Sequence, residues 1–290
     1  MVVSVPYERA VARNGEVEIA YEAFGEPDGR PLLLIAGLDG QMLWWWTDFC
    51  RLLAGRGYRV VRYDHRDSGL STHFTGHRGT AYTAVDMAGD ALAVLDALGW
   101  RDAHLCGASM GAGLGQYLAA TAPERVRTLT SMLSIPVDRP ASALAYVHPL
   151  RPFKLAFRRY GDDRASQIRR TVDVLRLTYP DGARFPEEQA RAVAAECHAR
   201  HPHDPTARRR QLAASRAVRF PAPGLAGITA PTLVIHGEDD PLVRPAGGRA
   251  VAARIPGARF VGYPGMGHNL PEERWTDIAD ELDRLTAGSR

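Results

Sequence analysis

Short, uninterrupted apolar runs alternate with stretches of helical periodicity along most of the chain. Residues 31–36 form one such run, and residues 58–63 and 103–106 form two others. A strand that is apolar on both faces must be covered on both faces, which is typical of a parallel sheet lying between helices. The alternation therefore predicts an α/β fold in which helices flank a mostly parallel, twisted sheet.

Local signals predict the remaining elements. The pair Asn14-Gly15, between residues 7–13 and 16–22, predicts a β-hairpin. Residues 83–98 carry apolar side chains at helical spacing, with Thr83 as the expected N-cap and Gly99 as the expected stop. We expect further helices at residues 44–54, 114–122 and 275–285, and further strands at residues 126–133, 232–236 and 259–263.

The alternation breaks between residues 135 and 222, which hold no buried-strand run and only helical stretches between prolines. A region of this length is more than a simple connection. We interpret residues 135–222 as a helical cap inserted into one core domain, formed by residues 1–134 and 223–290. From residue 151 to 219 there are sixteen Arg or Lys against eight Asp or Glu. This excess either favours an acidic or phenolate-bearing substrate or, more simply, is a solvated surface.

Composition narrows the class of protein. The chain has 290 residues, of which 45% are hydrophobic and 24% charged, and this is enough for a full core. No apolar stretch approaches a membrane span, and the first residues do not resemble a secretory signal. The three cysteines, Cys50, Cys106 and Cys197, fit free thiols in a reducing cytoplasm. The net charge is +3 and Lys154 is the only lysine, so the arginines indicate compositional bias rather than nucleic-acid binding. We expect a cytoplasmic monomer or homodimer without a membrane or nucleic-acid partner.

The segment Gly107-Ala-Ser-Met-Gly111 lies between a predicted strand and a predicted helix. A serine at the tip of a very tight turn has a strained backbone, so its neighbours must be small. Such a turn raises Ser109 Oγ above the sheet edge and leaves the Met110 N–H at a helix N-terminus, where the dipole favours negative charge. The motif predicts Ser109 as a nucleophile. The alternative is a strand-to-helix loop without chemistry.

A serine hydroxyl needs a base to act as a nucleophile near neutral pH. His268, in Gly265-Met-Gly-His268, follows the last predicted strand and so lies at the carboxyl edge, where open α/β sheets place their sites. The base in turn needs an acid to orient it. Three carboxylates follow the strand at residues 232–236, namely Glu238, Asp239 and Asp240, and Asp138 after residues 126–133 is a further possibility.

The developing oxyanion needs two hydrogen-bond donors. We expect one from Met110 N–H and the other from Leu38 N–H, because Gly37 lets the backbone turn after the strand at residues 31–36. Trp44-Trp45-Trp46 follows. These side chains either pack on the core or form an aromatic wall for a flat substrate, so Gly37, Trp44 and Trp45 are candidate substrate contacts.

Two other groups of residues attract attention without predicting a site. Cys197-His-Ala-Arg-His-Pro-His203 contains metal-ligating residue types, but it is polar, broken by proline and lacks a second ligand set. Asp64-His-Arg-Asp67 is more simply interpreted as a hydrogen-bonded turn that braces the site. We therefore expect no metal and no cofactor.

Together these motifs resemble the α/β-hydrolase superfamily over nearly the whole chain, and within it the group around aclacinomycin methylesterase. In that family the acid is the aspartate of a Gly-x-x-Asp pattern, which selects Asp240. The order Ser109, Asp240, His268 along the chain also matches the order of the fold. The departures are Ala112, where glycine is common, and the arginine-rich cap. The stretches that carry the resemblance are residues 36–44, 62–72, 107–111, 232–241 and 264–268.

The resemblance implies hydrolysis of a small-molecule methyl ester on a glycosylated aromatic polyketide, through an acyl-enzyme, in antibiotic biosynthesis. The same residues would also serve a cofactor-free perhydrolase, a carbon–carbon bond hydrolase or a thioesterase. A tailoring cyclase without net hydrolysis and a non-catalytic ligand-binding protein are the alternatives outside this chemistry. The complete set of serine, histidine and acid argues against a pure binder.

Overall fold

The computed structural model describes residues 5–76, 81–139, 145–148, 158–216 and 219–288. Within them the chain forms an eight-stranded sheet with the strand order β1-β2-β4-β3-β5-β6-β7-β8. Strands β3 to β8 are parallel, and β2 runs against both of its neighbours. The strands are β1 (Tyr7–Asn14), β2 (Val17–Phe24), β3 (Arg30–Ile35), β4 (Tyr58–Tyr63), β5 (Ala103–Ala108), β6 (Val126–Met132), β7 (Thr232–Gly237) and β8 (Arg259–Tyr263). The predicted α/β architecture is confirmed.

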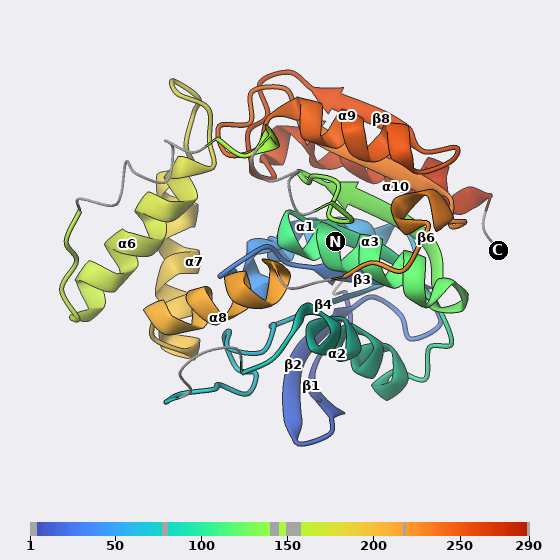
Figure 1. Ribbon diagram of the computed structural model, residues 1–290. Coiled ribbons are helices and arrows are strands. Elements are labelled where there is room, and N and C mark those ends of the chain that lie inside the picture. The colour runs from blue at the N-terminus through green and yellow to red at the C-terminus, as the bar shows by residue number, and fades with distance from the viewer. Residues whose placement is uncertain (1–4, 77–80, 140–144, 149–157, 217–218, 289–290) are drawn as a thin grey trace.

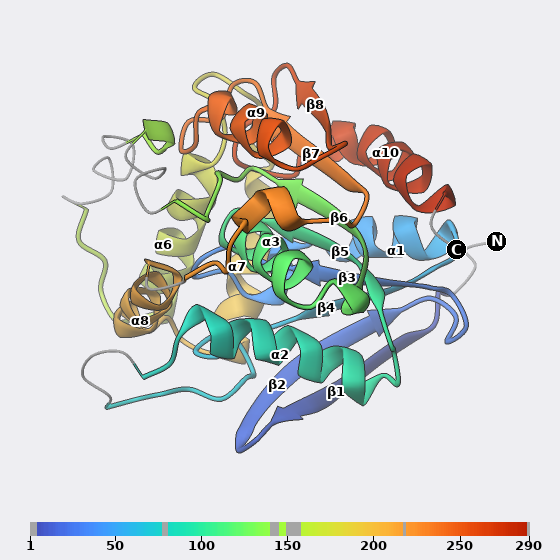
Figure 2. The ribbon, with the colours of Figure 1, turned by 45° about the vertical axis from the view of Figure 1, so that its right-hand side comes forward.

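Helices cover both faces of the sheet, as Figure 2 shows. Helices α2 (Ala84–Ala97), α3 (Met110–Thr121) and α9 (Pro245–Arg254) pack on one face, and α1 (Thr47–Gly55) and α10 (Trp275–Ala287) pack on the other. Short 3₁₀ helices lie at Met42–Trp44, Pro123–Arg125, Gly224–Gly227 and Glu272–Arg274.

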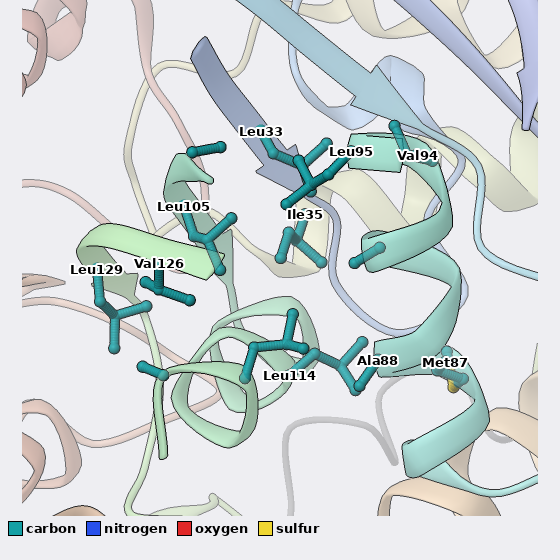
Figure 3. Packing of buried hydrophobic residues seen from close by; sticks show 14 of the residues in the cluster. Leu33, Ile35, Met87, Ala88, Val94, Leu95, Leu105, Leu114, Val126 and Leu129 are labelled. Atoms are coloured by element: carbon teal, nitrogen blue, oxygen red, sulfur yellow. The ribbon is translucent and has the colours of Figure 1, made fainter. Parts of the chain in front are cut away.

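Strand β3 illustrates why both faces are apolar. Leu33 and Ile35 join the cluster formed with α2 and α3 (Figure 3), whereas Leu32 and Leu34 join the cluster under α1 and α10. Successive side chains of a strand point to opposite faces, so an unbroken apolar run fills two cores at once.

Two helix boundaries differ from the expectation. The helix expected at residues 44–54 begins only at Thr47, because Trp45 and Trp46 have extended backbones and the Trp45 carbonyl accepts a hydrogen bond from Arg62. The helix expected at residues 114–122 begins earlier, at Met110, directly after Ser109. The expected N-cap at Thr83 is present as a capping box with Asp86.

Between β6 and β7, the α-helices of the described residues are α6 (Arg164–Leu177), α7 (Glu187–Arg200) and α8 (Pro205–Arg216). Figure 1 shows them together beyond one end of the sheet. We call residues 158–216 the α6–α8 segment. Its polar side chains contact the turns that follow β3 and β4, which places the segment over the carboxyl ends of the strands. Among the described helices, none combines the length and apolar character needed to cross a bilayer.

Candidate active site

Ser109 occupies a sharp turn between β5 and α3, with φ 55° and ψ −117°. Gly107 and Gly111, two residues before and two residues after it, have no room for side chains. A Cβ on Gly107 would lie 2.3 Å from the Gly111 carbonyl oxygen, and a Cβ on Gly111 would lie 2.2 Å from the Ile35 carbonyl oxygen. Backbone strain of this kind costs about 1–3 kcal/mol and persists where the surroundings impose it. The small residues of the motif are therefore required by the close approach of β3, β5 and α3.

His268 lies in the loop after β8, and its Nδ1 is 2.7 Å from Asp240 Oδ2. The other carboxylate oxygen, Asp240 Oδ1, accepts the backbone N–H groups of Leu242 and Val243, each at 2.8 Å. His236 Nε2 lies 3.3 Å from Asp240 Oδ2. Burial by itself raises the pKa of Asp240, but the two histidines outweigh it and hold that pKa well below its usual range. A buried carboxylate that accepts Nδ1–H leaves the imidazole Nε2 free to take a proton.

The other carboxylates considered from the sequence are engaged elsewhere. Asp138 Oδ2 accepts hydrogen bonds from Arg254 at 2.6 Å and from Leu225 N–H at 3.2 Å. Glu238 pairs with Arg249, and Asp239 Oδ2 accepts the Gly265 N–H at 2.7 Å. Among the four, the contact with the imidazole belongs to Asp240 within the described residues.

Ser109 and His268 both stand at the carboxyl edge of the sheet, after β5 and β8. In the part of the chain that the structure describes, no hydrogen bond joins Ser109 Oγ to His268 Nε2. Catalytic hydrogen bonds of unliganded enzymes are often long and tighten only when substrate is bound. The structure thus brings His268 and Asp240 into contact, and it places Ser109 at the same edge of the sheet.

The expected oxyanion donors lie next to the serine. A Cβ on Gly37 would be 3.4 Å from Ser109 Cβ and 4.0 Å from its Oγ, so the turn after β3 passes directly beside the hydroxyl. Leu38 follows in that turn. Met110 is the first residue of α3, where backbone N–H groups have no partner inside the helix.

An apolar cavity lies between the turn formed by residues 44–46, here called the tryptophan turn, and the α6–α8 segment. Trp44 and Trp46 line it, but Trp45 is fully buried in the core and stacks on Phe49 with ring centroids 6.3 Å apart. Trp45 was expected as a candidate substrate contact, but its complete burial shows that it packs in the core instead. The cavity is narrow and leaves only about 20 Å³ for the centre of a water molecule. Its other lining residues are Leu43, Leu175, Thr178, Tyr179, Phe185, Pro186, Ala190, Val193, Asn269 and Leu270.

The lining residues of the α6–α8 segment were not predicted from the sequence. The one signal available was the spacing of Leu175, Thr178 and Tyr179, which lie close together near the end of α6. Thr178 also explains a glycine of the histidine loop. Its carbonyl accepts the His268 N–H at 2.7 Å, and a Cβ on Gly267 would lie 2.3 Å from the same oxygen.

The two remaining motifs have structural roles. His201 stacks on His73 with centroids 3.6 Å apart, and His203 Nδ1 lies 3.9 Å from Asp39. In the described residues no three His, Cys, Asp or Glu side chains are arranged to hold a metal. Asp64 accepts the backbone N–H groups of Met42 at 2.7 Å and Leu70 at 2.9 Å, so the expected bracing turn is present.

Comparison with known proteins agrees with this fold. The family model of the alpha/beta hydrolase fold matches residues 30–274. Rhodomycin D methylesterase DauP of Streptomyces sp. (strain C5) is 37% identical over 289 residues, which cover 88% of this chain and 90% of that protein. Rhodomycin D methylesterase DnrP of Streptomyces peucetius is 34% identical over 290 residues, covering 89% and 91%. A crystal structure of a hydrolase from Pseudomonas aeruginosa PA01 superposes with a TM-score of 0.71 at 25% identity, covering 98% and 99%.

The chain therefore belongs to the α/β-hydrolase family. Its similarity to two methylesterases extends over nearly the full length of both sequences, and it is an ester-hydrolysing enzyme.

Proposed function

We propose that this protein is a serine carboxylesterase that hydrolyses the methyl ester of an aromatic polyketide. In this proposal Ser109 is the nucleophile, His268 the general base and Asp240 the acid that orients it. The observation that carries the proposal is the 2.7 Å contact between His268 Nδ1 and the buried Asp240 carboxylate, at the same sheet edge as a strained serine.

The mechanism follows from the roles of these groups. His268 Nε2 takes the Ser109 proton while Oγ attacks the ester carbonyl carbon, and the N–H groups of Leu38 and Met110 stabilise the oxyanion. The carbon–oxygen bond to the alcohol then breaks, and His268 returns the proton to the departing alkoxide. Water, deprotonated by His268, attacks the acyl-enzyme carbonyl carbon. The bond to Ser109 Oγ then breaks, and His268 returns the proton to Oγ, which releases the acid and free Ser109. Asp240 stays ionised throughout and stabilises the imidazolium.

The substrate class is supported by two observations. Both relatives are named rhodomycin D methylesterases, and the cavity beside Asn269 and Leu270 is lined by the aromatic rings of Trp44, Trp46 and Tyr179. Aromatic walls suit a flat, apolar substrate.

We further propose that residues 135–222 act as a cap over a core of residues 1–134 and 223–290. The cavity between the α6–α8 segment and the tryptophan turn is narrow, and its lining ends at Asn269 and Leu270, next to His268 in the sequence. In this proposal the α6–α8 segment moves away from the tryptophan turn to let substrate reach Ser109.

Matched substitutions of two acids test the triad. Asp240→Asn keeps the size of the side chain but removes the charge and replaces one accepting oxygen with an NH2 donor, so the hydrogen bond that orients His268 is disturbed. We expect kcat to fall about 10⁴-fold. The matched control is Asp138→Asn. The Asp138 carboxylate binds Arg254 rather than His268, so this variant should retain nearly full kcat. Ser109→Ala should abolish the burst with an activated ester and labelling by a fluorophosphonate. Equal labelling of wild type and Ser109→Ala would exclude this mechanism.

A panel of methyl esters that includes aromatic polyketides tests the substrate class, with products identified by mass spectrometry. The proposal predicts the free acid and methanol. Cyclised or rearranged products would instead indicate a tailoring reaction without net hydrolysis.

A further inference from the structure

We propose that Gln211, on α8, is a positioning residue for the oxyanion hole, so that docking of the α6–α8 segment completes the active site. The inference rests on the proposed function, because it gives a role to the turn that carries the Leu38 N–H. Its basis is a hydrogen bond between residues 172 positions apart in the sequence, Asp39 and Gln211.

The turn that carries Leu38 has a backbone that does not suit its sequence. Gly40 N–H donates to the Gly37 carbonyl at 3.3 Å, which closes a four-residue turn, and Asp39 at its third position has φ 62°. Turns with positive φ at this position strongly favour glycine. Aspartate adopts this conformation more readily than most residues but less readily than glycine. Contacts from outside the turn therefore help to hold it.

Gln211 supplies such a contact. The Asp39 N–H donates to Gln211 Oε1 at 2.9 Å, and Gln211 Nε2 donates to the Arg66 carbonyl at 3.0 Å. The glutamine is 1% exposed. Its amide orientation is fixed by chemistry, because the Asp39 N–H is a donor only and the Arg66 carbonyl is an acceptor only. A buried amide with both ends engaged holds the peptide between Leu38 and Asp39 in one orientation.

The same loop is held from α7 as well. Gln41 Nε2 donates to the Cys197 carbonyl at 2.9 Å, and Arg200 Nε donates to Gln41 Oε1 at 3.1 Å. Beside Gln211, Arg210 binds Asp67 through two hydrogen bonds of 2.7 and 2.9 Å, which anchors α8 to the turn after β4. The loop after β3 is thus hydrogen-bonded to two helices of the α6–α8 segment.

This arrangement couples segment docking to chemistry. When α8 moves away to admit substrate, Asp39 loses its acceptor and the turn can relax to conformations with negative φ. Leu38, one residue earlier, then no longer holds its N–H in a fixed direction beside Ser109. When α8 docks again over bound substrate, Gln211 again accepts the Asp39 N–H and the Leu38 N–H returns to its fixed direction. The oxyanion of the transition state is then stabilised in the closed form.

The test is Gln211→Leu, assayed with a methyl ester turned over by the wild type. Loss of a whole oxyanion donor costs about 10²–10³ in kcat, and misalignment should cost part of this, about 10- to 100-fold. KM should change less than about threefold. A transition-state analogue such as a boronic acid should lose affinity in proportion to kcat, whereas the product acid should not. Equal losses for both ligands would overturn the proposal.

Glycine at position 39 provides the rescue. Because glycine adopts positive φ without cost, Gln211→Leu should reduce kcat far less in an Asp39→Gly background than in the wild type. Asp39→Gly alone measures the effect of losing the carboxylate. If the reduction is the same in both backgrounds, the turn is not the route by which Gln211 acts. Gln211→Asn, which keeps an amide but cannot span both partners, gives the same comparison should the leucine variant not fold.

Gln116→Leu is the matched control, because Gln116 is an equally buried glutamine that binds Ser131 and Ser134 rather than the turn. It should lower stability without a selective loss of analogue affinity. Failure of the proposed function would appear as a wild type that forms no acyl-enzyme. Failure of this inference would appear as a Gln211→Leu enzyme that acylates at the wild-type rate.

Discussion

The sheet and the α6–α8 segment are held in place by different forces. The sheet is covered on both faces by continuous apolar clusters that include Leu34 and Ile35. The segment contacts the core through buried ion pairs, among them Arg200 with Asp64 and Arg210 with Asp67, in addition to smaller apolar contacts. Buried apolar side chains in its three described helices are few and small, namely Val172, Ala190, Ala194, Ala207 and Ala214.

This difference separates a rigid scaffold from a part that can open. Burial of a leucine-sized side chain contributes about 1.5–3 kcal/mol and does not depend on exact geometry. A buried ion pair nearly balances its desolvation cost, yet it is lost abruptly when one partner moves. Regions with few buried apolar contacts open locally at a lower free energy than the rest of a protein. We therefore expect the α6–α8 segment to open without unfolding the sheet.

The largest expected effect is on the scaffold. Leu34→Ala removes a fully buried side chain from the cluster under α1 and α10, and it should lower the free energy of unfolding by about 3–5 kcal/mol. Urea denaturation followed by circular dichroism measures the change. Val172→Ala, in α6, is the control. It should lower the free energy of global unfolding by less than about 1 kcal/mol, because the segment can open before the sheet unfolds. Similar shifts for the two variants would show that sheet and segment unfold as one unit.

The same contrast decides what the sequence predicts. Strands such as β4 and β8 coincide with the predicted ranges, because an apolar run between turn residues is a local signal. Ser109, Asp240 and His268 were also selected from local motifs. The late start of α1 was not predictable, because it depends on how Trp45 is buried against Phe49.

Polar contacts between residues far apart in the sequence cannot be predicted from local periodicity. The hydrogen bond from Asp39 to Gln211 joins residues 172 positions apart, and both residue types are ordinary for exposed turns and helices. The same holds for Arg210, one of sixteen Arg or Lys between residues 151 and 219. An abundant residue gives no indication of which copies are buried and paired.

Acid should affect the two regions separately. His104 in β5 and His203 beside α8 both have pKa values lowered to about 4, in each case by burial first and then by neighbouring arginines. An unfolded histidine has a pKa near 6.5. Between about pH 6.5 and 4 the unfolded or opened state therefore binds a proton that the folded state does not, so stability falls as the pH falls. The contribution over this range should be at most about 3 kcal/mol for His104 and smaller for His203, whose side chain is 17% exposed to screening solvent.

Variants distinguish the two effects. His104→Gln should flatten the pH dependence of global unfolding, measured by urea titration at each pH. His203→Gln should instead flatten the pH dependence of amide hydrogen exchange in α8 and leave the global curve nearly unchanged. A global curve that loses its acid slope in His203→Gln would contradict the separation of sheet and segment.

The smallest expected effect is local to α8. Arg210→Met keeps the length of the side chain but removes both hydrogen bonds to Asp67, which retains the Phe74 N–H at 2.7 Å. The free energy of opening α8, measured by hydrogen exchange, should fall by about 2 kcal/mol. The midpoint of global unfolding should stay unchanged. Arg209→Met, an exposed neighbour on the same helix, is the control and should alter neither quantity.

Salt tells whether the Arg210–Asp67 pair acts as a buried contact. Both side chains are at most 4% exposed, and buried pairs are screened far less than exposed ones. Raising sodium chloride from about 0.05 to 0.5 M shortens the screening length severalfold, yet it should change α8 opening in the wild type by much less than Arg210→Met does. If salt alone reproduced the effect of the mutation, water would already reach the pair in the docked state. The segment would then be attracted to the core through solvent rather than held by direct contact, and Gln211 would have no fixed helix from which to position the turn.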